Sequence, residues 1–282
     1  MYSRRYKVAV STPPLLWVCT LLFVPYLILL CYSFWHVGAG QTIEHSWDLA
    51  NYAQLFKNPM YVSVLFRSMR IAGAVTVLAL VFGYPLAYFL SFYATVRKGA
   101  LYQLVIIPLW VSYLVRGYAW KTILGNTGVL NGLLQYLHIT SEPVGWLLYS
   151  PIAVILTLTH IYTPFAFLPI YASLESIPRR LVEASQDLGA TPLETFWRVV
   201  LPLSLPGVLS GAIFAFVLSL GDFLAPLLVG GPDGIMISNI VVSLFGAAYN
   251  WPLGAAISAV MMILVVSLLF VVERLEKRLA PG

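Results

Sequence analysis

Ionisable side chains are scarce in the apolar parts of this sequence, and Asp222 is the one with the clearest chemistry. It lies in the segment Leu220-Gly221-Asp222-Phe223. A carboxylate in a medium of low dielectric could attract a cation that moves along a path through the protein. A structural role is equally open, because the carboxylate could cap a helix that is broken near Pro226 or pair with Arg116.

Two other polar side chains in apolar segments have simpler explanations. Arg116 stands near the outer end of its segment, where the aliphatic chain can lie among apolar groups while the guanidinium reaches water. His160 lies in the middle of a later segment. For His160 we expect a buried, neutral imidazole that is hydrogen-bonded to a neighbour, and the alternative is a proton relay.

Aromatic side chains could hold an amine by cation–π contact beside the carboxylate. The candidates for lining a substrate path are Asp222, Trp110, Tyr113, Tyr162 and Phe223. For Trp110 and Tyr162 the choice between path and packing stays open. Tyr118 and Trp120 instead fit the interfacial belt of aromatic residues that flanks transmembrane helices.

Motifs for nucleotide, metal and thiol chemistry are absent from the sequence. There is no G-x-x-x-x-G-K-[ST] segment to cradle nucleotide phosphates, no H-E-x-x-H and no C-x-x-C. No credible pair of nucleophile and base is present either. The sequence therefore predicts a transport protein rather than an enzyme, with no cofactor and no metal held by this chain.

The composition is that of a membrane protein. Of the 282 residues, 60% are hydrophobic and 10% are charged, whereas soluble domains carry roughly 25% charged residues. The net charge of +5 comes from basic residues at the ends of apolar segments, so it predicts no nucleic-acid partner.

Six apolar segments are long enough to cross a bilayer. They run over residues 15–34, 71–93, 101–119 with an interruption at Pro108, 148–171, 206–228 and 253–272. The predicted fold class is an all-α membrane protein with six transmembrane helices in a single domain, 1–282. With the N-terminus inside, eleven of the sixteen Lys and Arg residues fall on the inner side. The positive-inside rule then places both termini and the stretch 176–202 in the cytoplasm.

The longest polar stretch, 176–202, predicts two helices joined by a tight turn. Apolar and small residues recur at i, i+3, i+4 and i+7 from Leu181 to Leu188, which is one face of a helix. Gly189 stands where a helix ends with a residue of positive φ. Thr191 and Glu194 have the spacing of a capping box that begins the second helix.

This stretch resembles the EAA loop of binding-protein-dependent ABC importer permeases, whose pattern is E-A-A-x3-G-x9-I-x-L-P. Five positions are identical, while Ser185 and Val199 replace Ala and Ile. In that family the loop forms a coupling helix that docks into a cleft on a separate ATPase subunit. The residues to which the resemblance assigns ATPase coupling are Glu183, Ala184, Ser185, Asp187, Leu188, Gly189, Ala190, Leu201 and Pro202.

The same resemblance implies the partners and the location. They are a second, homologous permease subunit in a heterodimer, two ATPase subunits that bind ATP and Mg, and a periplasmic or extracellular solute-binding protein. The chain would be a multi-pass protein of the bacterial cytoplasmic (inner) membrane, in contact with lipid, and would work by alternating access.

The substrate class rests on a second resemblance. Pro108–Trp120 and Leu220–Phe223 are similar to the spermidine/putrescine-type permeases, which implies a polyamine or another small organic cation. Related permeases carry phosphonates, opines and other amines, so these substrates stay open. The competing class is a self-sufficient, ion-coupled secondary transporter that uses His160 and Asp222.

Overall fold

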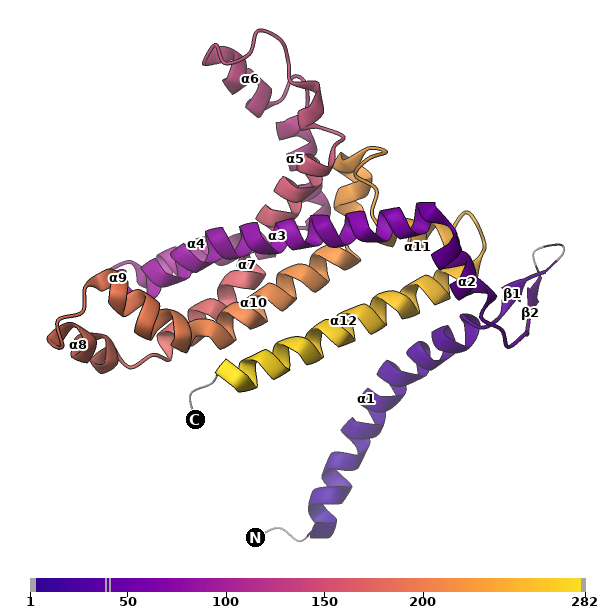
Figure 1. The fold of residues 1–282 in the computed structure, drawn as a ribbon, viewed down its shortest axis with the longest axis horizontal. Coiled ribbons are helices and arrows are strands. Elements are labelled where there is room, and N and C mark those ends of the chain that lie inside the picture. The colour runs from indigo at the N-terminus through magenta and orange to yellow at the C-terminus, as the bar shows by residue number, and fades with distance from the viewer. Residues whose placement is uncertain (1–3, 39, 41, 280–282) are drawn as a thin grey trace. The chain divides into compact units, whose positions relative to one another are not determined.

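The computed structural model describes residues 4–38, 40 and 42–279 of the chain (Figure 1). The side chains of residues 4–10 and 278–279, which include four of the basic residues used to predict orientation, lie outside this description. In the described residues, the regular secondary structure is helical apart from one short β-hairpin. In chain order the elements are α1 (Arg4–Tyr32), β1 (His36–Val37), β2 (Ile43–Glu44), α2 (Ala50–Lys57), α3 (Pro59–Phe92), α4 (Lys98–Trp110), α5 (Tyr113–Leu124), α6 (Val129–Tyr136), η1 (Gly145–Leu147), α7 (Pro151–Glu175), α8 (Arg179–Asp187), α9 (Pro192–Thr195), η2 (Phe196–Val200), α10 (Leu201–Gly221), η3 (Pro226–Gly230), α11 (Ile237–Phe245) and α12 (Trp251–Leu279).

The chain divides into two compact units, each of which is described by itself. The first comprises Met1–Val62 and Ile240–Leu264, and the second comprises Ser63–Asn239 and Val265–Gly282. In the first unit, strands β1 and β2 pair antiparallel. The buried Asn51 amide of α2 donates hydrogen bonds to the carbonyls of Ser33 and Trp35, at 3.0 and 2.6 Å. These bonds tie α2 to the end of α1. Both candidate functional regions belong to the second unit.

Five of the described helices are long and apolar enough to cross a membrane, and there are six if one bent pair is counted as a single span. Helix α3 begins at Pro59, before the predicted start of this span at residue 71, and includes Arg67 and Arg70. The prediction of an all-α, membrane-type fold with six spans therefore agrees with the helices when the bent pair is counted once.

The third predicted span, 101–119, is wrong as a single segment. Helix α4 ends at Trp110, α5 begins at Tyr113, and the two helical segments are bent by 93°. Val111 has φ −81° and ψ 133°, and Ser112 has φ −50° and ψ 138°, so two extended residues turn the chain. Pro108 lies within α4, where its missing N–H leaves the Leu104 carbonyl without its helical partner and weakens the helix before the turn.

The fifth predicted span, 206–228, is also interrupted. Helix α10 begins earlier, at Leu201, and ends at Gly221, because Asp222 has φ −74° and ψ 125°. The chain resumes as helix at Leu224 and continues through η3, a single π-helical turn. This break and the α4–α5 bend create the candidate site described below.

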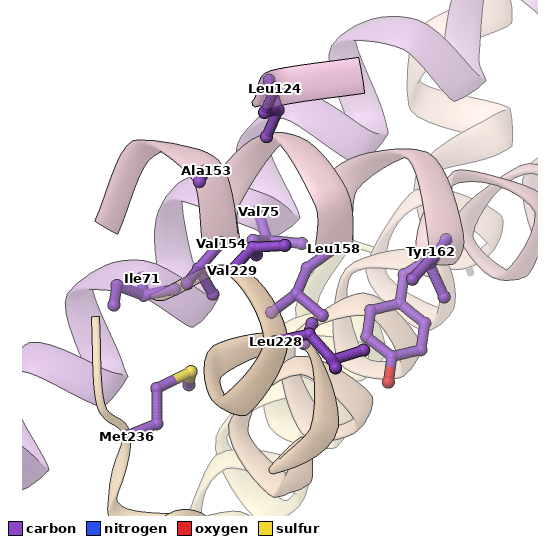
Figure 2. Close-up of a cluster of buried hydrophobic side chains, with 12 residues drawn as sticks. Ile71, Val75, Leu124, Ala153, Val154, Leu158, Tyr162, Leu228, Val229 and Met236 are labelled. Atoms are coloured by element: carbon purple, nitrogen blue, oxygen red, sulfur yellow. The ribbon is translucent and has the colours of Figure 1, made fainter. Parts of the chain in front are cut away.

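The core of the second unit is built around α7, which packs most extensively against α10. In Figure 2, Val154 and Leu158 of α7 lie close to Val75 of α3 and to Leu228 and Val229 of η3. Gly207 and Gly211, four residues apart on one face of α10, let this helix approach α7 closely. A Cβ at Gly211 would lie 2.7 Å from the Ala166 carbonyl oxygen of α7.

Gly211→Ala should therefore destabilise the α7–α10 pair. A methyl group forced to 2.7 Å from a backbone oxygen must displace a helix, and overpacking of this kind costs about 1–3 kcal/mol. The matched control is Gly132→Ala in α6, where a new Cβ would meet nothing within 4 Å. We expect thermal unfolding in detergent to begin several degrees lower for Gly211→Ala and to stay unchanged or rise for Gly132→Ala. Equal transition temperatures for the two variants would contradict the close approach.

Candidate functional site

The carboxylate of Asp222 lies at the break between α10 and η3 and is 7% exposed. Its Oδ1 accepts hydrogen bonds from the backbone N–H groups of Leu224 and Ala225, at 2.9 and 3.0 Å. The side chain thus caps the helix that begins after the break, in the way that Asp caps helix N-termini generally. The structure bears out the capping interpretation of Asp222.

Two tyrosines meet the other carboxylate oxygen. The hydroxyl of Tyr162 in α7 donates to Asp222 Oδ2 at 2.6 Å, and the hydroxyl of Tyr113, the first residue of α5, donates to the same oxygen. The Asp222 carbonyl in turn accepts from the Ser238 hydroxyl at 2.5 Å. One residue therefore connects α5, α7, the α10–η3 break and α11.

An open cavity of about 430 Å³ lies against this cluster. Its wall consists of aromatic and aliphatic side chains around the carboxylate, namely Tyr113, Tyr162, Val217, Leu218, Phe223 and Leu224. Four of the five predicted path residues, Asp222, Tyr113, Tyr162 and Phe223, are thus brought together. The fifth, Trp110, ends α4 with 87% of its surface exposed and does not line this cavity. Whether any of them contacts a substrate stays a prediction.

Arg116 and His160 lie beside the cluster without an ion pair to Asp222 in the part of the chain that the structure describes. The Arg116 guanidinium lies 5.7 Å from the centre of the Tyr113 ring. The Trp120 indole donates to Nδ1 of His160 at 3.1 Å, so that nitrogen carries no proton. The expected hydrogen-bonded imidazole is present, although His160 is exposed on this chain rather than buried.

The stretch 176–202, which we call the coupling hairpin, forms at the opposite end of this unit from α5 and α6 (Figure 1). Helix α8 ends before Gly189, whose φ of +86° confirms the predicted turn. Thr191 and Glu194 form the predicted capping box, with the Thr191 hydroxyl accepting from the Glu194 N–H at 3.3 Å. The Ser185 and Thr195 hydroxyls bond at 2.6 Å and hold the two arms together.

The coupling hairpin presents an uncovered mixture of acidic and apolar side chains. Glu183, Ala184, Asp187 and Gly189 are exposed, and Leu188 is 89% exposed, whereas Ser185 and Ala190 are half-buried. A hollow of about 330 Å³ lies between the arms, lined by Ser185, Leu188, Gly189, Ala190, Glu194, Arg198 and Val199. The apolar stripe predicted on α8 therefore does not pack into this chain. It forms a surface.

Leu201 and Pro202 do not lie on that surface but begin α10. The segment from Pro192 through the π-helical turn η2 into α10 is one continuous helix of 30 residues. Pro202 lacks an N–H, which removes the α-helical partner of the carbonyl four residues earlier. The π-helical turn η2 precedes this proline, and in it the Leu201 N–H bonds the Phe196 carbonyl, five residues back.

Arg179 is a residue whose role sequence reasoning missed. Its guanidinium donates to the carbonyls of Ser91 and Phe92, the last two residues of α3, and lies 4.8 Å from the centre of the Phe92 ring. Nearby, Lys98 at the start of α4 pairs with Glu175 at 2.6 Å. The sequence held a signal for this contact. Arg179 is the first residue of α8, where a cation opposes the helix dipole, whereas the same cation is favoured at the C-terminal carbonyls of α3.

The comparisons with known proteins agree with one another on the family of this chain. The family described as binding-protein-dependent transport system inner membrane component matches residues 2–281. The spermidine/putrescine transport system permease protein PotB of Haemophilus influenzae is 35% identical over 263 residues, which cover 93% of this chain and 91% of that protein. The inner membrane ABC transporter permease protein YdcU of Escherichia coli is 38% identical over 274 residues, covering 93% and 87%.

A solved structure has the same fold. It is that of a bacterial alginate ABC transporter in complex with an alginate pentasaccharide-bound periplasmic protein. The similarity has a TM-score of 0.73 at 18% sequence identity and covers 98% of this chain and 96% of that chain. At this level of identity the similarity concerns the fold alone.

The turn of the coupling hairpin gives a direct test of Gly189. A Cβ there would meet nothing within 4 Å, so any penalty comes from the positive φ alone. Gly189→Val should open the turn at a cost of about 1–2 kcal/mol, while Gly189→Asn should cost less because Asn tolerates this conformation. In limited proteolysis in detergent, we expect cleavage within 186–191 to be roughly fivefold to thirtyfold faster for Val than for Gly. Equal cleavage of the Val and Asn variants would contradict the conformational explanation.

Proposed function

This chain belongs to the binding-protein-dependent transport system inner membrane components, and from that premise we propose that it carries a small organic cation of the polyamine class inward. It is a multi-pass permease subunit of an ABC importer in the bacterial inner membrane. The observation that carries the substrate class is its identity to proteins named as spermidine/putrescine permeases in two organisms, at 35% and 34% over 93% of the chain.

The cavity beside Asp222 supports a cationic substrate. Its wall is made of tyrosine and phenylalanine rings and aliphatic groups around one carboxylate. Aromatic faces attract ammonium groups when water is excluded, and the methylene chain of a polyamine fits an apolar wall. Phosphonates and opines carry anionic groups, for which this wall offers no lining cation. Another amine is the alternative that remains.

We assign the driving force to two separate ATPase subunits that bind ATP and Mg, with no cofactor in this chain. The exposed Glu183, Asp187 and Leu188 of the coupling hairpin would dock on one ATPase. A second, homologous permease completes the pathway in a heterodimer, and a solute-binding protein delivers the cargo. Movement of the hairpin would act directly on the spans, because the helix from Pro192 to Gly221 is continuous.

The orientation follows from the positive-inside rule, with both termini and the coupling hairpin in the cytoplasm. Arg97 and Lys98 in the α3–α4 turn and Arg179 and Arg180 in α8 then lie on the same side. The contact of Arg179 with the end of α3 supports this, because it holds both groups at one end of the unit.

A self-sufficient, ion-coupled carrier is the competing class, and His160 and Asp222 would be its ion sites. Family membership favours the importer. The hydrogen bonds also argue against the carrier, because both carboxylate oxygens of Asp222 already accept bonds within the chain.

The orientation can be tested by thiol labelling in intact cells. In a variant with Cys19 and Cys31 replaced by Ser, Asp187→Cys should resist a membrane-impermeant maleimide until the cells are opened. Asn126→Cys, in the segment after α5 that should face outward, should be labelled at once. Labelling of Asp187→Cys in intact cells would place the coupling hairpin on the outer side of the membrane, where it could not contact an ATPase, and would contradict the proposed importer mechanism.

Reconstitution tests the function itself. The chain is assembled in proteoliposomes with its partner permease, ATPase and binding protein, and uptake of radiolabelled spermidine, putrescine and a phosphonate is measured with ATP. We expect uptake of at least one polyamine and none of the phosphonate. Uptake confined to non-cationic cargo would overturn the substrate class.

The same preparation tests coupling. Glu183→Ala removes an exposed carboxylate that does not contribute to the core of this chain. If Glu183 pairs with a basic residue of the ATPase, the loss of one member of that charged interface pair costs several kcal/mol of binding free energy. Co-purification of the ATPase should fall tenfold or more, with normal membrane insertion. Glu142→Ala, an equally exposed carboxylate on the predicted outer side, should leave co-purification unchanged.

A further inference from the structure

The acceptor sites of the Asp222 carboxylate are all occupied. An ionised carboxylate offers about four lone-pair sites on its two oxygens. Oδ1 takes the N–H groups of Leu224 and Ala225, and Oδ2 takes the hydroxyls of Tyr113 and Tyr162. The carboxylate is also 7% exposed. A cation entering the cavity therefore finds no free carboxylate site to bind.

The same bonds fix the polarity of the two tyrosines. A tyrosine hydroxyl has a single O–H donor, and its oxygen keeps acceptor capacity. Both O–H groups are used on Asp222, so each hydroxyl can offer the cavity only an acceptor. A hydrogen bond to a charged group also polarises the donor and strengthens the next bond that its oxygen accepts.

We propose that Asp222 is a positioning residue that orients the Tyr113 and Tyr162 hydroxyls, so that their oxygens and ring faces bind the ammonium group of the cargo. The specificity residues are then the two tyrosines, and the carboxylate does not touch the cation. This inference rests on the proposed function, because it takes an organic cation as the cargo. The ligand class it predicts is a cation with N–H donors.

Transport gives a physical reason for this arrangement. A bare carboxylate in a dry cavity would hold an ammonium group strongly, and a carrier site must let its ligand leave. Because the Asp222 oxygens are taken by hydrogen bonds within the chain, binding falls to the hydroxyl dipoles and ring faces of the two tyrosines, which hold a cation more weakly and let it leave.

The decisive variant is the double change Tyr113→Phe with Tyr162→Phe. It keeps both rings and the carboxylate charge, and it removes both acceptors. If the carboxylate bound the cation directly, uncovering Oδ2 would preserve or increase transport. The proposal predicts the opposite, a fall of about tenfold or more in spermidine moved per ATP hydrolysed. Hydrolysis stimulated by the loaded binding protein should stay within about twofold of wild type.

Two further variants complete the test. Tyr118→Phe is the matched control, since Tyr118 lies on the same helix and does not line the cavity. Asp222→Asn keeps an oxygen to cap the break, but its NH2 would donate to the tyrosine oxygens and turn their O–H groups toward the cavity. It should lose transport as the double variant does, with normal assembly.

The outcomes separate the two proposals. If the wild-type complex moves no organic cation, the proposed function fails. If it does, and the double variant moves as much spermidine per ATP as wild type and Tyr118→Phe, the positioning role of Asp222 is overturned while the function stands. Should the double variant fail to assemble, the single variants Tyr113→Phe and Tyr162→Phe decide by the same ratio. Failure of the double variant, both single variants and Asp222→Asn to assemble would make the cluster purely structural and would also overturn the inference.

Discussion

A break in a membrane-embedded helix exposes backbone N–H and C=O groups that lipid cannot satisfy, and the structure around Asp222 depends on meeting that constraint. The carboxylate takes the two N–H groups at the start of the helix after the break, and the Asn239 side chain donates to the Phe223 carbonyl at 2.7 Å. Because the break is satisfied internally, it can lie beside a cavity without costing the fold its stability. The two tyrosines then use the remaining capacity of the same carboxylate.

The break and the coupling hairpin are the two ends of one helix. From Pro192 to Gly221 the chain stays helical for 30 residues, about 45 Å at 1.5 Å per residue. The capping box of Thr191 and Glu194 lies at the N-terminal end of this helix, and Asp222 is the residue directly after its C-terminal end. Under the proposed function, an ATPase that displaces the coupling hairpin would also move Val217, Leu218 and Gly221 in the cavity wall, because no loop interrupts the helix between them.

Much of this could be predicted from the sequence, since local signals determine local structure. The capping box of Thr191 and the positive φ of Gly189 each follow from residue type and spacing, and both are confirmed. The family resemblance read from the EAA loop is confirmed by the family match, and the resemblance to spermidine/putrescine permeases by relatives that cover most of the chain. The break at Asp222 was foreseen only as one of several alternatives, because Gly221 and Pro226 mark it weakly.

What could not be predicted depends on residues far apart in the chain. The two helices that flank Val111 are together apolar enough for one span, so hydropathy alone does not distinguish a straight span from a 93° bend. Tyr113 meets Asp222 across 109 positions, and Arg179 meets Ser91 across 88. Such pairs follow from the packing of whole helices. Trp110 shows that nearness in sequence does not predict these contacts. It is three residues from Tyr113, yet the bend separates it from the cavity.

The contacts of α7 decide which parts of this unit can move together. Helix α10 lies so close to α7 that a Cβ at Gly207 or Gly211 would lie 2.6 or 2.7 Å from a backbone oxygen of α7. Tyr162 ties α7 to the Asp222 end of α10, and Ser204 of α10 bonds the Tyr84 hydroxyl of α3 at 3.0 Å. Helix α5 packs against α7 and η3, and its first residue, Tyr113, reaches the Asp222 carboxylate. Under the proposed function, a tilt of α10 would be passed to α7 and α5, because Asp222 accepts bonds from Tyr162 and Tyr113. The two tyrosines that line the cavity are therefore also the links between the end of α10 and its neighbouring helices.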